Sequence, residues 1–176
     1  CYLIFVPSRF YLSPAREKSE YDLHDNQVDD PGYRRFLNRL YAPLVARLSP
    51  VARGLDFGCG PGPALAAMLR EGGFTVALYD IFYAPDRSAL ATKYDFITAT
   101  EVVEHLHYPY GELQTLWGCL EKNGVLAIMT KLALDATAFA GWHYKNDPTH
   151  ICFFSRQTFE FLANTLNAKL EFMADD

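Results

Sequence analysis

One stretch of the sequence decides the fold, and it reads Leu55-Asp56-Phe57-Gly58-Cys59-Gly60-Pro61-Gly62-Pro63. A buried strand is predicted at residues 54–57, and residues 64–70 have the composition of a helix. Glycines between a strand and a helix allow a sharp turn and let the backbone approach a ligand with no Cβ in the way. The helix start then offers free N–H groups and a positive dipole end to a carboxylate. The stretch therefore predicts a ligand-binding loop.

Outward from this loop, strands alternate with helices. Further apolar strands are predicted at 74–79, 94–99, 125–130 and 170–173, a helical turn at 101–107, a turn at 121–124, and helices at 33–48, 110–120 and 155–167. The strands are continuous apolar runs, which is typical of a parallel sheet covered on both faces. The sequence thus predicts an α/β, doubly wound and mostly parallel sheet, with the ligand site at the carboxyl ends of its strands. Residues 81–93, between the second and third strands, are short and irregular.

The domain organisation follows from the same pattern. A length of 176 residues suits one domain. Residues 1–32 are rich in Tyr, Pro and charge and show no sustained period, so we expect an N-terminal extension or cap, with His24 structural or covering the cofactor. Residues 33–176 form the main domain, whose first helix is interrupted by Pro43 and can kink there. Because the chain begins at Cys1 rather than Met, we expect that it is trimmed.

Composition excludes several classes of partner. A net charge of −5 gives no electrostatic footprint for a nucleic-acid backbone, although a neutral or locally basic patch stays open as an alternative. No apolar run is long enough to cross a bilayer. Four cysteines lie far apart with no CxxC pair, which favours reduced thiols and a cytoplasmic location. Cys1 as the remnant of an upstream zinc site is an open alternative. The sequence indicates no oligomeric state.

Two acidic residues sharpen the meaning of the glycine loop. Asp56 lies directly before the glycines, where a carboxylate repels a pyrophosphate and attracts the ammonium group of a methionine moiety. Asp80 ends the second strand, where it can accept hydrogen bonds from ribose hydroxyls. The alternative is a structural glycine turn and a solvated acid at a strand end. The two acids together favour a nucleoside cofactor that carries an amine.

A second motif, Tyr94-Asp95-Phe96-Ile97-Thr98-Ala99-Thr100-Glu101-Val102-Val103-Glu104-His105-Leu106, follows at the third strand. Together the two motifs resemble those of class I S-adenosylmethionine-dependent methyltransferases. The likeness spans roughly residues 53–161 and is similar to the ubiquinone-biosynthesis O-methyltransferase group, of the methyltransferase domain family 23 type. It implies a Rossmann-like fold, S-adenosylmethionine as cofactor and S-adenosylhomocysteine as product.

The resemblance also implies which residues bind this cofactor. Those around the methionine part are Asp56, Gly58, Cys59, Gly60, Pro61 and Gly62; those around the ribose and adenine are Tyr79, Asp80 and Ile81; those near the sulfonium are Ala99, Thr100 and Glu101. Residues 81–93 replace a strand and helix that the family usually has. Asp86 is therefore a candidate contact for the adenine amino group, and Ile81 and Phe82 could flank the ring.

Acids and histidines form a second candidate cluster. Glu101, Glu104 and His105 are spaced to face one direction on a helical turn, where they could repel, share a proton or bind a divalent metal. A resemblance to plant-type small-RNA 2′-O-methyltransferases and ubiquinone O-methyltransferases implies a metal at Glu101, Glu104, His105 and His150. Without a metal, the catalytic residues would be Glu104 with His105 or His150 as general base. His143 could replace His150, and a merely structural role for the cluster also stays open.

The sequence thus predicts methyl transfer to a small-molecule acceptor, with a hydroxyl oxygen preferred because the histidines can activate it. An aromatic wall beside the acceptor is expected from Tyr108, Tyr110, Phe139, Trp142 and Tyr144. The alternatives are a nucleotide-cofactor oxidoreductase and a non-catalytic module that binds S-adenosylmethionine.

Overall fold

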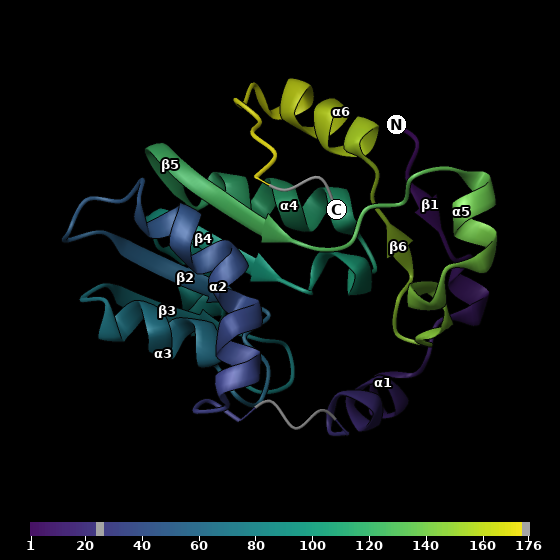
Figure 1. Cartoon of the computed structure of the whole chain (residues 1–176), viewed down its shortest axis with the longest axis horizontal. Helices are drawn as coiled ribbons and strands as arrows, with labels where there is room; N and C mark the ends of the chain where they lie inside the picture. Colours follow the sequence, from purple (N-terminus) through teal and green to yellow (C-terminus); the bar gives the residue numbers. More distant parts are fainter. Residues whose placement is uncertain (24–26, 174–176) are drawn as a thin grey trace.

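The computed structural model describes residues 1–23 and 27–173. In that part of the chain, a central sheet has four parallel strands in the order β3-β2-β4-β5. They are β2 (Arg53–Phe57), β3 (Thr75–Tyr79), β4 (Tyr94–Thr100) and β5 (Leu120–Met129). Helices α2 (Pro31–Val45) and α3 (Ala64–Glu71) cover one face, and α4 (Pro109–Gly118) and α6 (Arg156–Leu166) cover the other (Figure 1). The predicted doubly wound α/β fold is confirmed.

Each face of the sheet carries its own apolar core. In β4 the side chain of Phe96 packs with α2 and α3, whereas its neighbour Ile97 packs with α4 and α6, and both are fully buried. A Cβ on Gly54 of β2 would lie 2.1 Å from the Phe96 ring. Glycine at residue 54 thus makes room for the aromatic ring that fills the first core.

Several predicted boundaries shift in the structure. Helix α2 begins earlier than predicted, at Pro31 after the capping carboxylate of Asp30, and it contains Pro43 and ends at Val45. Strand β5 is longer than predicted because residues 121–124, expected as a turn before it, lie inside it. Asn123 there has a left-handed φ of 65°, and the pairing with β4 shifts register between Tyr94 and Phe96. The predicted turn is therefore a local irregularity within the strand.

The strand predicted at residues 170–173 is wrong. Phe172 instead packs on α6, where its ring lies 6.4 Å from that of Phe159 and 4.4 Å from the Arg156 guanidinium. A groove of about 1190 Å³, lined by residues of both β5 and 167–173, lies between this segment and the sheet. Since the segment is held on the helix, its backbone does not join β5.

The N-terminal residues pack against the rest of the chain through a second, two-stranded sheet. Strand β1 (Ile4–Phe5) pairs antiparallel with β6 (Cys152–Phe153), and α1 (Pro14–Tyr21) follows (Figure 1). The Ser13 side chain caps the first turn of α1. Short turns of 3-10 helix and one further helix complete the described elements: η1 (Ser8–Phe10), η2 (Arg87–Ala91), η3 (Val103–His105), α5 (Ala136–Gly141) and η4 (His143–Asn146). Residues 81–93 are irregular apart from η2, as predicted. His24 lies outside the described residues. Within the described ranges, the helices are too short or too polar to cross a membrane.

Candidate active site

The glycine loop between β2 and α3 is packed on one side and open on the other. Gly58 and Gly60 have left-handed φ angles of 72° and 62°, which glycine adopts without steric cost. A Cβ on Gly58 would lie 2.4 Å from Cγ2 of Val102, whereas a Cβ on Gly60 would meet no atom within 4 Å. The loop is therefore pressed against the segment after β4 and leaves space beside Gly60.

Asp80 lies beside this loop, as expected for the ends of neighbouring parallel strands. Its Oδ2 accepts a hydrogen bond from the backbone N–H of Gly60 at 3.0 Å. Its Oδ1 accepts two more, from the N–H groups of Phe82 and Tyr83 at 2.8 and 3.0 Å. The side chain of Ile81, which lies between Asp80 and Phe82 in the sequence, is exposed. One carboxylate thus fixes both the glycine loop and the start of the loop after β3.

Asp56 lies beneath the loop and not on its surface. Its side chain is 4% exposed, and its carboxylate accepts a hydrogen bond from Thr98 Oγ1 at 2.7 Å. Burial raises the pKa of Asp56 to about 6, although the bond from Thr98 opposes this. The expectation that this carboxylate faces an incoming amine therefore has to be revised, because the geometry makes it a buried support of the loop.

The end of β4 combines an unsatisfied hydroxyl with a strained backbone. Among the described side chains, Thr100 Oγ1 is the buried oxygen or nitrogen that has no hydrogen-bond partner. The next residue, Glu101, has a left-handed φ of 52°, and its N–H donates to the Met129 carbonyl at 2.8 Å. Non-glycine residues in this region are uncommon and cluster at functional sites. Ala99, also expected near the cofactor, is fully buried just before them.

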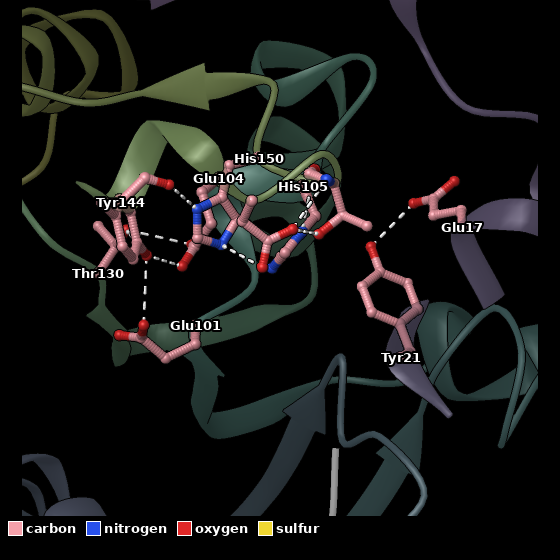
Figure 2. Close-up of polar contacts among 10 residues, drawn as sticks. Glu17, Tyr21, Glu101, Glu104, His105, Thr130, Tyr144 and His150 are labelled. Atoms are coloured by element: carbon pink, nitrogen blue, oxygen red, sulfur yellow. Dashed lines mark hydrogen bonds and ion pairs between the residues drawn. The ribbon is translucent and has the colours of Figure 1, made fainter. Parts of the chain in front are cut away.

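Two carboxylates meet after β4, although not on one helix. The predicted helical turn at 101–107 is only the 3-10 turn η3, and Glu101 lies outside it, so the expected single helical face is wrong. The Tyr144 hydroxyl instead brings the two acids together, because it donates to Glu104 Oε1 and lies 3.2 Å from Glu101 Oε2 (Figure 2). Thr130 Oγ1 donates to Glu104 Oε2 at 3.1 Å. Burial, with the nearby Glu101 charge, raises the pKa of Glu104 to about 7, and burial also raises the pKa of Glu101.

Both predicted histidines lie beside Glu104. Nδ1 of His105 lies 3.1 Å from the Thr149 carbonyl, and Nδ1 of His150 lies 2.6 Å from the Tyr144 carbonyl. Because a carbonyl only accepts, each Nδ1 carries a proton, and a neutral ring then presents Nε2 as the acceptor. Ligand atoms of Glu104, His105 and His150 all lie within 4.8 Å of one another. Two imidazoles and a carboxylate suit a divalent metal, and neither Glu101 nor His143 belongs to this group.

The N-terminal helix contributes residues that the sequence did not reveal. The Tyr21 ring meets that of His105 edge-on at 5.3 Å and lies 5.8 Å from the Phe82 ring. Its hydroxyl donates to Glu17 at 2.9 Å (Figure 2). The Glu17 carboxylate also lies 3.5 Å from His107 Nε2. Glu17 and Tyr21 are spaced i, i+4 behind the Ser13 cap. This short helix signal was present in the sequence, but it did not indicate what the helix would cover.

Two other predictions are corrected by the structure. Of the expected aromatic wall, Phe139, Trp142 and Tyr144 pack together with Phe153, while Tyr108 and Tyr110 are exposed. Asp86 does not reach the carboxyl end of the sheet. Its carboxylate caps η2, and it lines a cavity with Arg53 and Thr75, the first residues of β2 and β3. The short η2 turn holds Asp86 away from any adenine site beside Asp80.

Known proteins place the chain in a family. Curated proteins give no match to it. One similar solved structure is a SAM-dependent methyltransferase from Archaeoglobus fulgidus, with 18% identity and a TM-score of 0.59, covering 76% of this chain and 68% of that one. A second is 1,6-didemethyltoxoflavin-N1-methyltransferase from Burkholderia thailandensis with bound S-adenosylhomocysteine, with 17% identity and a TM-score of 0.59, covering 96% of this chain and 85% of that one. A third is the SAH-bound form of CalO1, a methyltransferase in calicheamicin biosynthesis, with 14% identity and a TM-score of 0.56, covering 80% of this chain and 50% of that one. At these identities the likeness shows the fold alone. The profile of a methyltransferase domain family, however, matches residues 33–171, and the chain therefore belongs to the methyltransferase domain family.

Proposed function

We propose that this protein transfers the methyl group of S-adenosylmethionine to a small-molecule acceptor. The observation that carries the proposal is the open side of the glycine loop at Gly60, bounded by the carboxylate of Asp80. The unsatisfied hydroxyl of Thr100 lies at the end of β4, the strand next to β2 in the sheet. Two structures of the same fold carry S-adenosylhomocysteine, which supports this cofactor. Family membership does not favour the oxidoreductase alternative.

The residues present fit such a cofactor. The glycine loop, with Cys59, Pro61 and Gly62, would surround the methionine part above the buried Asp56. Asp80, with Tyr79 and Ile81, would hold the ribose and the start of the adenine, and Ala99 to Glu101 would lie toward the sulfonium. The bound cofactor supplies a methyl group on a sulfonium, which is already a good leaving group. The protein therefore has to position the acceptor, exclude water and remove a proton.

The N-terminal extension is part of this proposal. We infer that α1 covers the carboxyl edge of the sheet, because it is attached on both sides of the proposed site. Asp22, directly after α1, accepts from the Tyr83 hydroxyl at 2.6 Å in the loop after β3, while Glu17 contacts His107 in the loop after β4. Tyr21 between them faces His105. An element fixed to both loops would shield the transfer region from water.

Calorimetric titration with S-adenosylmethionine and S-adenosylhomocysteine tests the cofactor assignment. We expect micromolar binding of both, and no heat with NADH at the same concentrations. Binding of NADH, with no binding of S-adenosylmethionine or S-adenosylhomocysteine, would instead favour the oxidoreductase alternative. A panel of small acceptors then tests turnover, and failure with all of them, despite cofactor binding, would favour the non-catalytic module.

For the acceptor we propose a hydroxyl oxygen, and for its activation a divalent metal at Glu104, His105 and His150. In support, both histidines donate Nδ1 to a backbone carbonyl, an arrangement common among metal-binding histidines. A metal held by these residues would lower the pKa of an acceptor hydroxyl bound to it. Glu101, which was also predicted as a ligand, would not bind the metal itself but would be linked to Glu104 through the Tyr144 hydroxyl. Turnover is expected to stop after chelation and to return with Mg²⁺, Mn²⁺ or Zn²⁺. Turnover that is unchanged by chelators would contradict the metal, and would leave His105 or His150 as a general base without a metal.

A further inference from the structure

Tyr144 belongs to an apolar cluster but also makes polar contacts with Glu104 and His150 of the Glu104–His105–His150 cluster. Its side chain is 7% exposed and belongs to η4, the short turn that precedes His150. Phe139 and Trp142 pack beside it in the same apolar cluster, but of these three aromatic residues it is Tyr144 that hydrogen-bonds to Glu104 and His150. This distinguishes Tyr144 from the rest of the aromatic wall.

The side chain of Tyr144 acts on Glu104. Its hydroxyl donates to Oε1 of Glu104, while Thr130 donates to Oε2 at 3.1 Å. With a donor on each oxygen, the plane of the carboxylate is fixed and not free to rotate. Carboxylates that bind metals are commonly held in this way by hydrogen bonds from outer residues.

The backbone and ring of Tyr144 act on His150. The Tyr144 carbonyl lies 2.6 Å from His150 Nδ1, which sets the tautomer, and the two ring centroids are 4.1 Å apart. The same histidine ring meets that of His105 at 4.7 Å. Figure 2 shows Tyr144, Glu104 and His150 directed toward one another. One residue therefore touches two members of the cluster by separate chemical groups.

We propose that Tyr144 is the positioning residue of the Glu104–His105–His150 metal centre, orienting Glu104 through its hydroxyl and His150 through its carbonyl and ring. This inference rests on the proposed metal site. Tyr144 also links that centre to the strand end beside the cofactor loop, because its hydroxyl lies 3.2 Å from Glu101. The Tyr144 hydroxyl has a single hydrogen, which Glu101 and Glu104 have to share. We therefore expect the position of the Glu101 side chain to depend on how that hydrogen is shared.

The test uses Co²⁺ as the probe, because its visible absorption reports ligand geometry without any need for turnover. The full chain is titrated with Co²⁺ after removal of metal by a chelator, and the Tyr144→Phe variant is compared with it. Phenylalanine keeps the ring and the carbonyl but removes the hydroxyl. We expect affinity for Co²⁺ to fall about 10–100-fold, the usual effect of removing such an outer contact, with a changed spectrum. Tyr108→Phe, which alters an exposed tyrosine, serves as the matched control and should bind as the parent does.

Each outcome separates the two proposals. Co²⁺ binding by the parent, with equal affinity and spectrum for Tyr144→Phe, would overturn the positioning role and leave the metal site intact. No binding by the parent would remove the metal site and this inference together, while calorimetry with S-adenosylhomocysteine still tests the cofactor. Should Tyr144→Phe not fold, Tyr144→Leu also removes the hydroxyl and keeps the backbone carbonyl. Parental affinity and an unchanged spectrum for that variant would equally overturn the positioning role.

Discussion

The carboxylate of Asp80 and the backbone nitrogen of Gly60 lie 3.0 Å apart and share a hydrogen bond, although 20 residues separate them in sequence. The bond joins the carboxyl end of β3 to the middle of the glycine loop. The conformation of the loop is therefore held by the same side chain that is proposed to accept hydrogen bonds from the ribose hydroxyls. Removal of this carboxylate should affect both the shape of the loop and the contact with the ligand.

We accordingly expect Asp80→Ala to weaken binding of S-adenosylhomocysteine by roughly 1.5–3 kcal/mol, which is the range for hydrogen bonds to charged groups. Calorimetry measures this directly. Asp86→Ala is the matched control, because Asp86 caps η2 away from the loop, and its affinity should stay at the parental value. Equal affinities for both variants would show that the ribose is held elsewhere.

The glycines of the chain should not respond alike to alanine. Gly60→Ala places a side chain in open space but at a left-handed φ, which costs about 1–2 kcal/mol. Gly58→Ala adds a clash with Val102 to the same strain, so we expect the larger loss of stability, together with loss of cofactor binding. Gly118→Ala, at the end of α4 with open space around it, should gain about 0.5–1 kcal/mol. Denaturant unfolding ranks the three variants, and a Gly58→Ala variant as stable as Gly118→Ala would contradict the packing of the loop on Val102.

The buried Asp56 makes stability depend on pH. Its pKa rises from 3.8 in the unfolded chain to about 6 in the folded protein, so the folded state keeps the proton longer. Its contribution to the free energy of unfolding is therefore greatest below pH 3.8, falls as the pH rises through about 6, and stays low above that. Asp56→Asn removes this loss and keeps an acceptor for Thr98. Relative to the parent, the variant should gain ~3 kcal/mol in stability between acidic and alkaline conditions. Denaturant unfolding of both proteins at each pH measures this difference. A free energy of unfolding that changes equally with pH in parent and variant would contradict the role of Asp56.

Thr100 offers a test of ligand contact at the end of β4. Its hydroxyl is buried and unsatisfied in the described structure, so Thr100→Val should leave the free protein as stable or gain about 1 kcal/mol. If the hydroxyl bonds to the cofactor, affinity for S-adenosylhomocysteine should fall about 2–10-fold, the value of one neutral hydrogen bond. Thr98→Val is the contrasting variant, because it breaks the bond to Asp56 and should destabilise the protein. Unchanged affinity for Thr100→Val would place the ligand away from this residue.

The proposed cover of α1 predicts protection by the cofactor. Arg16 is exposed on α1, and Lys122 is exposed in β5 far from the proposed site. We expect S-adenosylhomocysteine to slow trypsin cleavage after Arg16 and to leave cleavage after Lys122 unchanged. Equal slowing at both sites would indicate a general stabilisation, and no slowing at Arg16 under saturating ligand would argue against the cover.

Local patterns were enough to predict the four strands of the central sheet and the closeness of Asp80 to the glycine loop. Leu55, Phe57 and the residues of β4 form continuous apolar runs, and Gly58 and Gly60 occur where a strand must turn into a helix. Asp80 could be placed beside them because parallel neighbours end at the same edge. The features of the loop lie within residues 53–100, where the alternation of strands and helices is enough to place the strand ends side by side.

The other half of the site depends on contacts that no local pattern encodes. Tyr144 reaches Glu101 across 43 residues, and Tyr21 meets His105 from a helix near the start of the chain. Strand β1 has two residues, too few for a period, and the left-handed Glu101 could not be inferred from a residue type that rarely adopts that conformation. The apolar residues 170–173 looked like a strand because the sequence does not show that α6 binds Phe172.

The pairing of β1 with β6 has a consequence for the order in which the site is assembled. Ile4 pairs with Phe153, so the strand that follows the His150 loop is completed by residues far from it in the sequence. Contacts between such distant residues close a long loop, and these closures slow folding. Residues 53–100 need no such closure. We therefore expect the half with the glycine loop to fold first, and the Glu104–His105–His150 cluster to form last, once β1 and β6 have paired.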